Sequence, residues 1–245
     1  MIKPHDENPA GKKEQVREMF DSIARRYDLL NHLLSMNIDR RWRAQVVRMI
    51  RRQAPQSVLD MATGTGDLAI AVGHALPAAA VTGMDLSPGM LRIGREKVAA
   101  RFPGREFPMI EGDAEALPFA DGAFEAVTCG FGVRNFEDLP KGLREMYRVL
   151  AVGGRAYILE FSMPSEHNVP GRLYRFYFRR ILPEIGRLVS KDARAYTYLP
   201  ESVGEFPYGE RFCGMLAEAG FADPQMKVLM GGIATIYTAG KPGKR

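Results

Sequence analysis

Apolar positions repeat at helical intervals over the first quarter of the chain. Between residues 12 and 34 they recur every three or four positions, which is the spacing of one helix face. A second such pattern covers about residues 39–52, with Trp42 and Ile50 on its apolar side. Arginines, Arg43 among them, fill other positions there, and we interpret them as a solvated face. Both stretches are predicted to be amphipathic helices.

After residue 55 short apolar strands alternate with helices. The predicted strands cover residues 57–62, 80–85, 106–111, 124–130 and 155–161. The predicted helices between them cover residues 67–76, 88–101 and 139–150, the last one ended by Gly153-Gly154. This alternation favours a parallel sheet with helices on both faces.

The remaining sequence completes a single α/β domain. Residues 163–205 contain several prolines and an Arg-rich, aromatic stretch at 171–194, and they break the alternation. A helix at 210–219 and strands at 225–230 and 232–239 then suit an antiparallel end of the sheet. We therefore expect one domain built on a seven-stranded, mostly parallel sheet, and we divide its chain into four parts. These are an N-terminal helical cap (12–52), a cofactor-binding core (57–161), a helical lid insertion (163–205) and a C-terminal helix with a strand pair (206–245).

The segment Asp60-Met-Ala-Thr-Gly-Thr-Gly66 joins the first of these strands to a helix. Its glycines allow a sharp turn and a close approach to a ligand. The dinucleotide pattern G-x-G-x-x-G is not met, and Asp67 at the helix start would oppose a pyrophosphate. This argues against NAD and favours a cofactor without phosphates. The candidate cofactor-binding residues in the loop are Asp60, Thr63, Gly64, Thr65 and Gly66.

Two more carboxylates follow the next strands. Asp85, with Leu86 after it, can accept both hydroxyl hydrogens of a ribose. Asp113 can accept from an adenine amino group, and the amide of Ala114 can donate to a ring nitrogen. Each acid alone could be a turn or a helix cap. Carboxylates at the ends of consecutive strands, where such sheets bind ligands, instead indicate an adenosine site, and with the loop they predict S-adenosyl-L-methionine.

Composition and charge bear on the location, the cysteines and the partners of the protein, and less on its reaction. The chain has 245 residues, 46% of them hydrophobic and 26% charged, and no apolar run long enough to span a bilayer. The polar N-terminus lacks the apolar core of a signal peptide, so we expect a cytoplasmic protein. Cys129 and Cys213 are far apart without nearby histidines, and we expect two buried thiols and no metal site. The net charge of +5 leaves nucleic acid, anionic lipid and anionic ligands open as partners.

Three stretches carry a resemblance to the ubiquinone/menaquinone biosynthesis C-methyltransferase family. They are Tyr27-Asp-Leu-Leu-Asn-His-Leu-Leu-Ser35 with Trp42, then Phe131-Gly-Val-Arg-Asn135, and then Arg148-Val-Leu-Ala-Val-Gly-Gly-Arg-Ala-Tyr-Ile-Leu-Glu-Phe-Ser162. The resemblance runs from about Val16 to Gly240. The chain departs from the family at Asp39, where histidine is common, at Ala151-Val152, which replace Lys-Pro, and at Gly130, where serine is common.

The resemblance implies a Rossmann-like, class I S-adenosylmethionine-dependent methyltransferase. It implies methylation of a ring carbon on a reduced polyprenyl quinone. The substrate it favours is demethylmenaquinol, and 2-polyprenyl-6-methoxy-1,4-benzoquinol is an additional candidate. Arg134 would then favour the phenolate, Asn135 would orient a water or a quinol oxygen, and Tyr27 would cap the pocket. The alternatives are that Arg134 only pairs with a carboxylate and that Tyr27 is part of the core.

Other functions and partners stay open at this stage. A methyltransferase of another small molecule would have the same cofactor half. An RNA methyltransferase fits the basic charge, but no appended RNA-binding module supports it, and we expect no nucleic-acid partner. A non-catalytic scaffold is the third alternative. An insoluble prenyl tail would require contact with the inner membrane surface, through the N-terminal helices and residues 171–194. A homodimer is a further open expectation.

Overall fold

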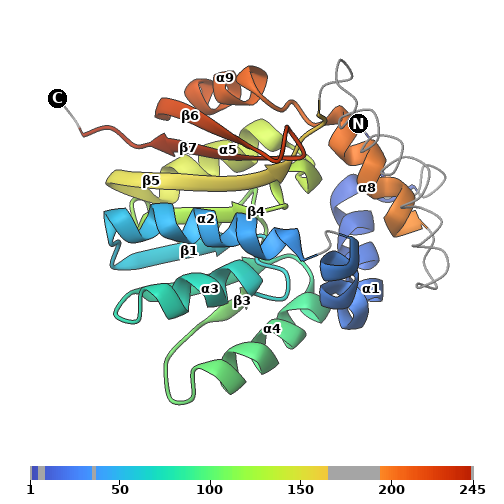
Figure 1. Cartoon of the computed structure of the whole chain (residues 1–245), viewed down its shortest axis with the longest axis horizontal. Coiled ribbons are helices and arrows are strands. Elements are labelled where there is room, and N and C mark those ends of the chain that lie inside the picture. Colours follow the sequence, from blue (N-terminus) through green and yellow to red (C-terminus); the bar gives the residue numbers. More distant parts are fainter. Residues whose placement is uncertain (1, 5–8, 35–36, 165–193, 244–245) are drawn as a thin grey trace.

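The computed structural model describes residues 2–4, 9–34, 37–164 and 194–243. Its strands form one sheet of order β3-β2-β1-β4-β5-β7-β6 (Figure 1). The strands are β1 (Ser57–Met61), β2 (Ala80–Asp85), β3 (Met109–Glu111), β4 (Phe124–Gly130), β5 (Leu150–Phe161), β6 (Ala222–Leu229) and β7 (Ala234–Gly240). The helices are α1 (Lys12–Leu34), α2 (Ile38–Gln53), α3 (Asp67–Ala75), α4 (Pro88–Arg101), the 3-10 turn η1 (Val133–Asn135), α5 (Leu139–Val149), α8 (Arg194–Glu205) and α9 (Glu210–Glu218).

Strands β1 to β5 pair in parallel, and β7 runs antiparallel to both β5 and β6. The predicted seven-stranded, mostly parallel sheet with an antiparallel end is therefore confirmed. Alternate side chains of each strand face opposite sides of the sheet. In β1, Val58 joins the core cluster under α2, α3 and α4, whereas Leu59 and Met61 join the cluster under α5 and α9. Two helical layers thus cover the sheet, one on each face (Figure 1).

The helix ends agree with the sequence patterns, with one exception. Residues Gly153-Gly154 were predicted to end a helix, but α5 already ends at Val149 and the two glycines lie inside β5. The backbone of the pair continues the sheet, since Gly153 N donates to Lys241 O at 2.9 Å and Lys241 N donates to Gly154 O at 2.9 Å. Gly153 has φ +80°, which favours glycine over other residues. The prediction was wrong because these partners are distant in sequence.

Helices α1 and α8 stand side by side at the end of the sheet where β1 and β4 finish (Figure 1). Tyr198 of α8 packs there against Val16 and Met19 of α1 in a small apolar cluster. Helix α8 belongs to the predicted lid insertion. The Arg-rich stretch at residues 171–194 falls almost entirely outside the described residues.

Candidate active site

A pocket opens at the carboxyl ends of β1, β2, β3 and β4, the place where ligands bind in sheets of this kind. The space between its walls amounts to about 730 Å³, including solvent at its mouth. Helix α1 forms the opposite wall. Among the predicted site residues, those that line this pocket are Tyr27, Gly64, Asp85, Leu86, Asp113, Ala114 and Asn135.

The glycine loop is bent toward β2 by backbone hydrogen bonds. Thr63 N donates to Met84 O at 2.9 Å, and Gly64 N donates to a carboxylate oxygen of Asp85 at 2.7 Å. Gly64 and Gly66 have φ values of +57° and +82°, where a side chain would be strained. Two pocket residues that are not glycine, Ala62 at φ +51° and Phe131 at φ +60°, adopt the same region. Such backbone strain is often concentrated at functional sites.

Asp60 lies behind the loop rather than in the pocket wall. Its side chain is fully buried and accepts hydrogen bonds from the hydroxyls of Thr63, at 2.6 Å, and Thr128. Burial raises the pKa of Asp60 to about 6, although these hydrogen bonds act in the opposite direction. A smaller cavity beneath the loop brings Asp60 and Thr63 together with Arg43 and shares Tyr27 with the main pocket. Asp60 thus binds the loop through Thr63, whereas Asp85 binds it through Gly64.

Thr65 is turned into a group of charged side chains and away from the main pocket. Its hydroxyl donates to Asp28 of α1 and accepts from Lys97 of α4 at 3.1 Å. The Lys97 ammonium also binds Asp28, at 2.9 Å, and Asp67. These contacts join α1, the loop, α3 and α4. The role of Thr65 visible here is thus to fasten helix α1 to the cofactor loop.

Arg43 is buried, so the solvated face predicted for this residue is wrong. Its guanidinium binds Asp39 one turn earlier in α2 and lies 3.5 Å from Asp67. The i,i+4 spacing of Asp39 and Arg43 was a usable signal for this pair. The buried acid that stands in the family's histidine position therefore holds an arginine beside the loop.

The two carboxylates predicted to bind adenosine, Asp85 and Asp113, both line the pocket. The oxygens of Asp85 accept from Gly64 N and from Ser87 N, at 2.7 and 2.9 Å, and burial raises its pKa. Asp113 accepts from Glu115 N at 2.9 Å, while its other oxygen binds the ammonium of Lys13 at 2.6 Å. Lys13 also lies 3.0 Å from Glu115. Sequence reasoning missed Lys13, because nothing local indicates which side of α1 covers the pocket.

Arg134 pairs with a buried carboxylate, and this contact is compatible with both of the roles that the sequence left open for it. Its Nη1 lies 2.8 Å from Oε1 of Glu160 and also donates to the Phe131 carbonyl. Glu160 is fully buried at the end of β5, and its pKa is raised by burial, against the opposing effect of the Arg134 cation. The guanidinium also rests over the ring of Phe161, 5.6 Å from its centroid. Glu160 was overlooked, although it lies in the third stretch of resemblance.

Asn135 of η1 and Tyr27 of α1 both line the pocket. The side-chain oxygen of Asn135 is buried and has no hydrogen-bond partner in the described part of the chain. Tyr27 meets Phe20 edge-on at 5.9 Å, and a Cβ added to Gly64 would lie 3.9 Å from the Tyr27 ring. The ring of Tyr27 therefore covers the loop, as a capping residue would.

A family model described as the ubiE/COQ5 methyltransferase family matches residues 9–241. The chain belongs to the ubiE/COQ5 methyltransferase family. It is 44% identical over 240 residues to a demethylmenaquinone methyltransferase of Bacteroides fragilis, covering 98% of this chain and 97% of that protein. It is 50% identical over 224 residues to the enzyme of that name in Thermus thermophilus, covering 91% and 100%. The ubiquinone/menaquinone biosynthesis C-methyltransferase UbiE of Geobacter sulfurreducens is 48% identical over 231 residues, covering 94% and 90%.

Solved structures with low identity establish the fold alone. Phosphoethanolamine N-methyltransferase 2 of Haemonchus contortus, in complex with S-adenosyl-L-methionine, superposes with a TM-score of 0.59 at 17% identity, over 82% of this chain and 53% of that one. The [4+2]-cyclase SpnF superposes with a TM-score of 0.61 at 17% identity, over 96% and 98%. Since the same fold serves a cyclase, the family match and not the fold makes this chain a methyltransferase.

Within the described residues, no helix is both long and apolar enough to cross a membrane. Cys129 and Cys213 are buried free thiols, as expected.

Proposed function

We propose that this methyltransferase transfers a methyl group from S-adenosyl-L-methionine to a ring carbon of a reduced polyprenyl quinone. Demethylmenaquinol is the substrate we favour, and 2-polyprenyl-6-methoxy-1,4-benzoquinol is the second. The observation that carries this proposal is the near full-length identity of 44–50% to enzymes named for demethylmenaquinone. The pocket supports it, because carboxylates suited to adenosine share one space with an apolar, aromatic wall that includes Phe20, Phe131 and Phe136.

The donor set fits this cofactor. Asp85 would accept from the ribose hydroxyls, and Asp113 and Ala114 would bind the adenine edge beside Leu86. The loop from Thr63 to Gly66, backed by Asp60, would hold the methionine end. When bound, S-adenosyl-L-methionine supplies a methyl group attached to a sulfonium, which an electron-rich carbon can attack.

Arg134, beside the pocket, and the pocket residues Asn135 and Tyr27 would prepare the acceptor ring. A phenol has a pKa near 10, so its loss of a proton at neutral pH needs a nearby cation. Arg134 is fixed by Glu160 and would stabilise the phenolate, with the proton leaving to water. Electron density then moves to the neighbouring ring carbon, which forms the new bond to the methyl group and afterwards loses its own proton. Asn135 would orient the ring oxygen, and Tyr27 would exclude water above the loop.

The reaction is tested with purified enzyme, isotopically labelled cofactor and short-chain quinols. We expect label in the product with the reduced naphthoquinone, fixed to a ring carbon by mass spectrometry, and none with the oxidised form. A parallel reaction with the reduced benzoquinone separates the two quinol classes. Label on an oxygen atom, or no product from either quinol while calorimetry shows cofactor binding, would refute the proposal.

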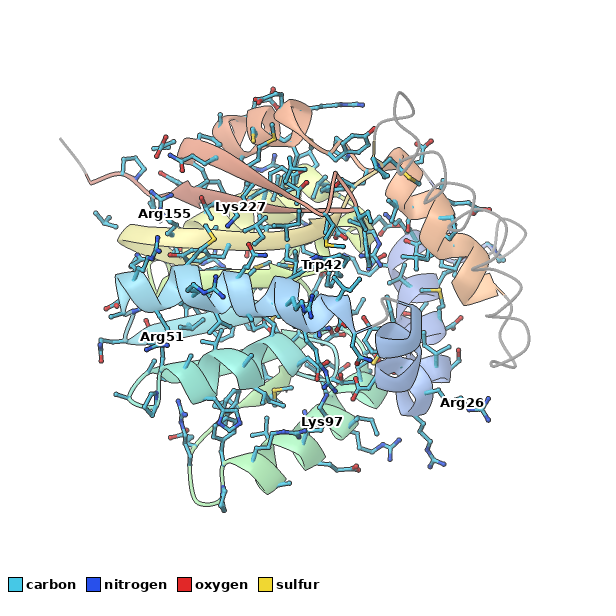
Figure 2. All side chains as sticks on the ribbon, in the orientation of Figure 1. Arg26, Trp42, Arg51, Lys97, Arg155 and Lys227 are labelled. Carbon is cyan, nitrogen blue, oxygen red and sulfur yellow. The ribbon has the colours of Figure 1, made fainter. Side chains whose placement is uncertain are left out.

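The substrate tail also suggests a membrane contact. We propose that α1 faces anionic lipid through exposed arginines such as Arg25 and Arg26, the second of which projects outward from the helix (Figure 2). Co-sedimentation with vesicles of anionic lipid should fall as salt rises and should weaken in a variant with both residues changed to glutamine. Equal sedimentation with neutral vesicles would contradict this contact.

A further inference from the structure

Three buried polar atoms around η1 and α8 lack hydrogen-bond partners in the described part of the chain. They are Nε of Arg134, Oδ1 of Asn135 and the hydroxyl of Tyr198. Arg134 and Asn135 lie in η1, and Tyr198 lies in α8, which packs against η1. A buried polar group without a partner costs about 1–3 kcal/mol, and native proteins contain few of them. Three in adjoining elements therefore indicate a place for a polar ligand.

Tyr198 is held in place by apolar contacts, while its hydroxyl stays unused. The residue is 3% exposed and packs against Val16 and Met19 of α1. Helix α8 packs against η1, which carries Arg134, and the charges of both Arg134 and Glu160 influence the pKa of the Tyr198 hydroxyl. Burial raises the pKa of Tyr198 to about 12, which keeps the hydroxyl protonated and able to donate at neutral pH.

The aromatic surroundings match the polar atoms. The guanidinium of Arg134 rests over Phe161, whose ring lies 4.4 Å from that of Phe131 and 6.2 Å from that of Trp42, centroid to centroid. Phe131 also lines the main pocket together with Asn135. Asn135 thus lines the space proposed for the cofactor, and the Arg134 guanidinium rests on an aromatic cluster that reaches the same space through Phe131.

We propose that the hydroxyl of Tyr198, with Nε of Arg134 and Oδ1 of Asn135, forms the binding site for a ring oxygen of the hydroquinone substrate. The inference rests on the proposed function and adds a residue of the insertion to it. The set offers two donors and one acceptor, which is what a phenolic hydroxyl needs. The substrate hydroxyl donates to Asn135 and accepts from Tyr198 and Arg134. Once it is a phenolate, the two donors remain and stabilise the negative oxygen.

Tyr198→Phe tests the site because stability and activity should respond in different ways. The ring and its packing remain, and the buried hydroxyl without a partner is removed, so the unfolding temperature should stay the same or rise. The value of kcat/KM for the quinol should fall about tenfold or more, because the variant lacks one hydrogen bond to the reacting oxygen. The pH–rate profile should shift to higher pH, because the phenolate has lost a donor. Cofactor affinity should not change.

Tyr237→Phe is the matched control. Tyr237 is also fully buried, with a pKa raised by burial to about 12, but its hydroxyl accepts a hydrogen bond from Gly209 N at 2.7 Å. Its removal should lower the unfolding temperature and leave kcat/KM and the pH profile of the folded enzyme unchanged.

Two failures can be told apart. If the unmodified enzyme methylates a quinol and Tyr198→Phe has the same kcat/KM and pH profile, the binding site proposed here is overturned. If the unmodified enzyme transfers no methyl group to any quinol, the proposed function itself fails.

Discussion

The buried ion pair of Arg134 and Glu160 provides a test in which the two partners should respond differently to pH. Nη1 and Oε1 lie 2.8 Å apart, and the side chains are 7% and 0% exposed. Removing one partner of a buried pair costs about 3–5 kcal/mol, because the other charge is left without compensation. The perturbations are Glu160→Gln and Arg134→Met.

Glu160→Gln leaves a cation that cannot lose its proton at any accessible pH. We therefore expect the full loss of about 3–5 kcal/mol throughout the range from about pH 5 to about pH 8. For a chain of this size each kcal/mol corresponds to about 2–4 °C, so the unfolding temperature should fall by roughly 6–20 °C.

Arg134→Met leaves a carboxyl that can take up a proton. Burial already raises the pKa of Glu160 and Arg134 opposes this, so losing the cation raises that pKa further. A carboxyl with a raised folded-state pKa contributes stability that is present below its unfolded-state pKa and is lost as pH rises through the folded-state pKa. The variant should approach the unmodified protein near about pH 5 and lose up to about 1.4 kcal/mol per pH unit above it.

Urea unfolding at several pH values measures both responses, together with the double variant, which lacks both charges and should be more stable than Glu160→Gln. The control is Glu14→Gln, which breaks an exposed pair with Arg17 at the surface and should leave the stability nearly unchanged. A loss below about 1 kcal/mol for Glu160→Gln, or the same pH dependence for both single variants, would refute this account of the pair.

Two predictions concern the cofactor end of the pocket, and calorimetric titration with S-adenosyl-L-methionine checks both. Asp85→Asn should weaken binding by about 10- to 150-fold, since a charged hydrogen bond contributes about 1.5–3 kcal/mol, and unchanged affinity would remove Asp85 from the site. Lys13→Met should strengthen binding a few-fold, because Asp113 no longer has to exchange the ammonium at 2.6 Å for an adenine amino group. Weaker binding would instead make Lys13 a cofactor contact.

The parts of this fold that the sequence predicts are those that depend on neighbours in the chain. Strand β4 and helix α4 have the bounds that their apolar spacing indicates. Asp85 and Asp113 were placed correctly because the carboxyl ends of parallel strands share one edge of the sheet. Gly153 was misplaced because its hydrogen-bond partner, the carbonyl of Lys241, comes from the far end of the chain.

The candidate site shows the same division. Tyr27 and Asn135 could be selected as pocket residues from motifs. The partnership of Arg134 with Glu160 could not, because only the pairing of β4 with β5 brings the strand ends together. Tyr198 carried no sequence signal, since its place depends on how α8 packs over η1.

Helix α1 lines the pocket with apolar side chains such as Phe20 and is tied to it by polar contacts, and this bears on how the proposed cofactor would enter. At its start, Lys12 donates to the carbonyls of Arg134 and Phe136, at 3.0 and 2.8 Å, and burial with the nearby Arg134 cation lowers the pKa of Lys12 to about 8. Lys13 holds Asp113, and further along Asp28 binds the loop. Partly exposed ion pairs contribute little net stability. The apolar cluster under α1 is also small, so it adds little. It is smaller than the two clusters against the sheet, so α1 can part from the pocket at less cost than the sheet can open. Under the proposed function, Lys13 would have to leave Asp113 before an adenine could bind there.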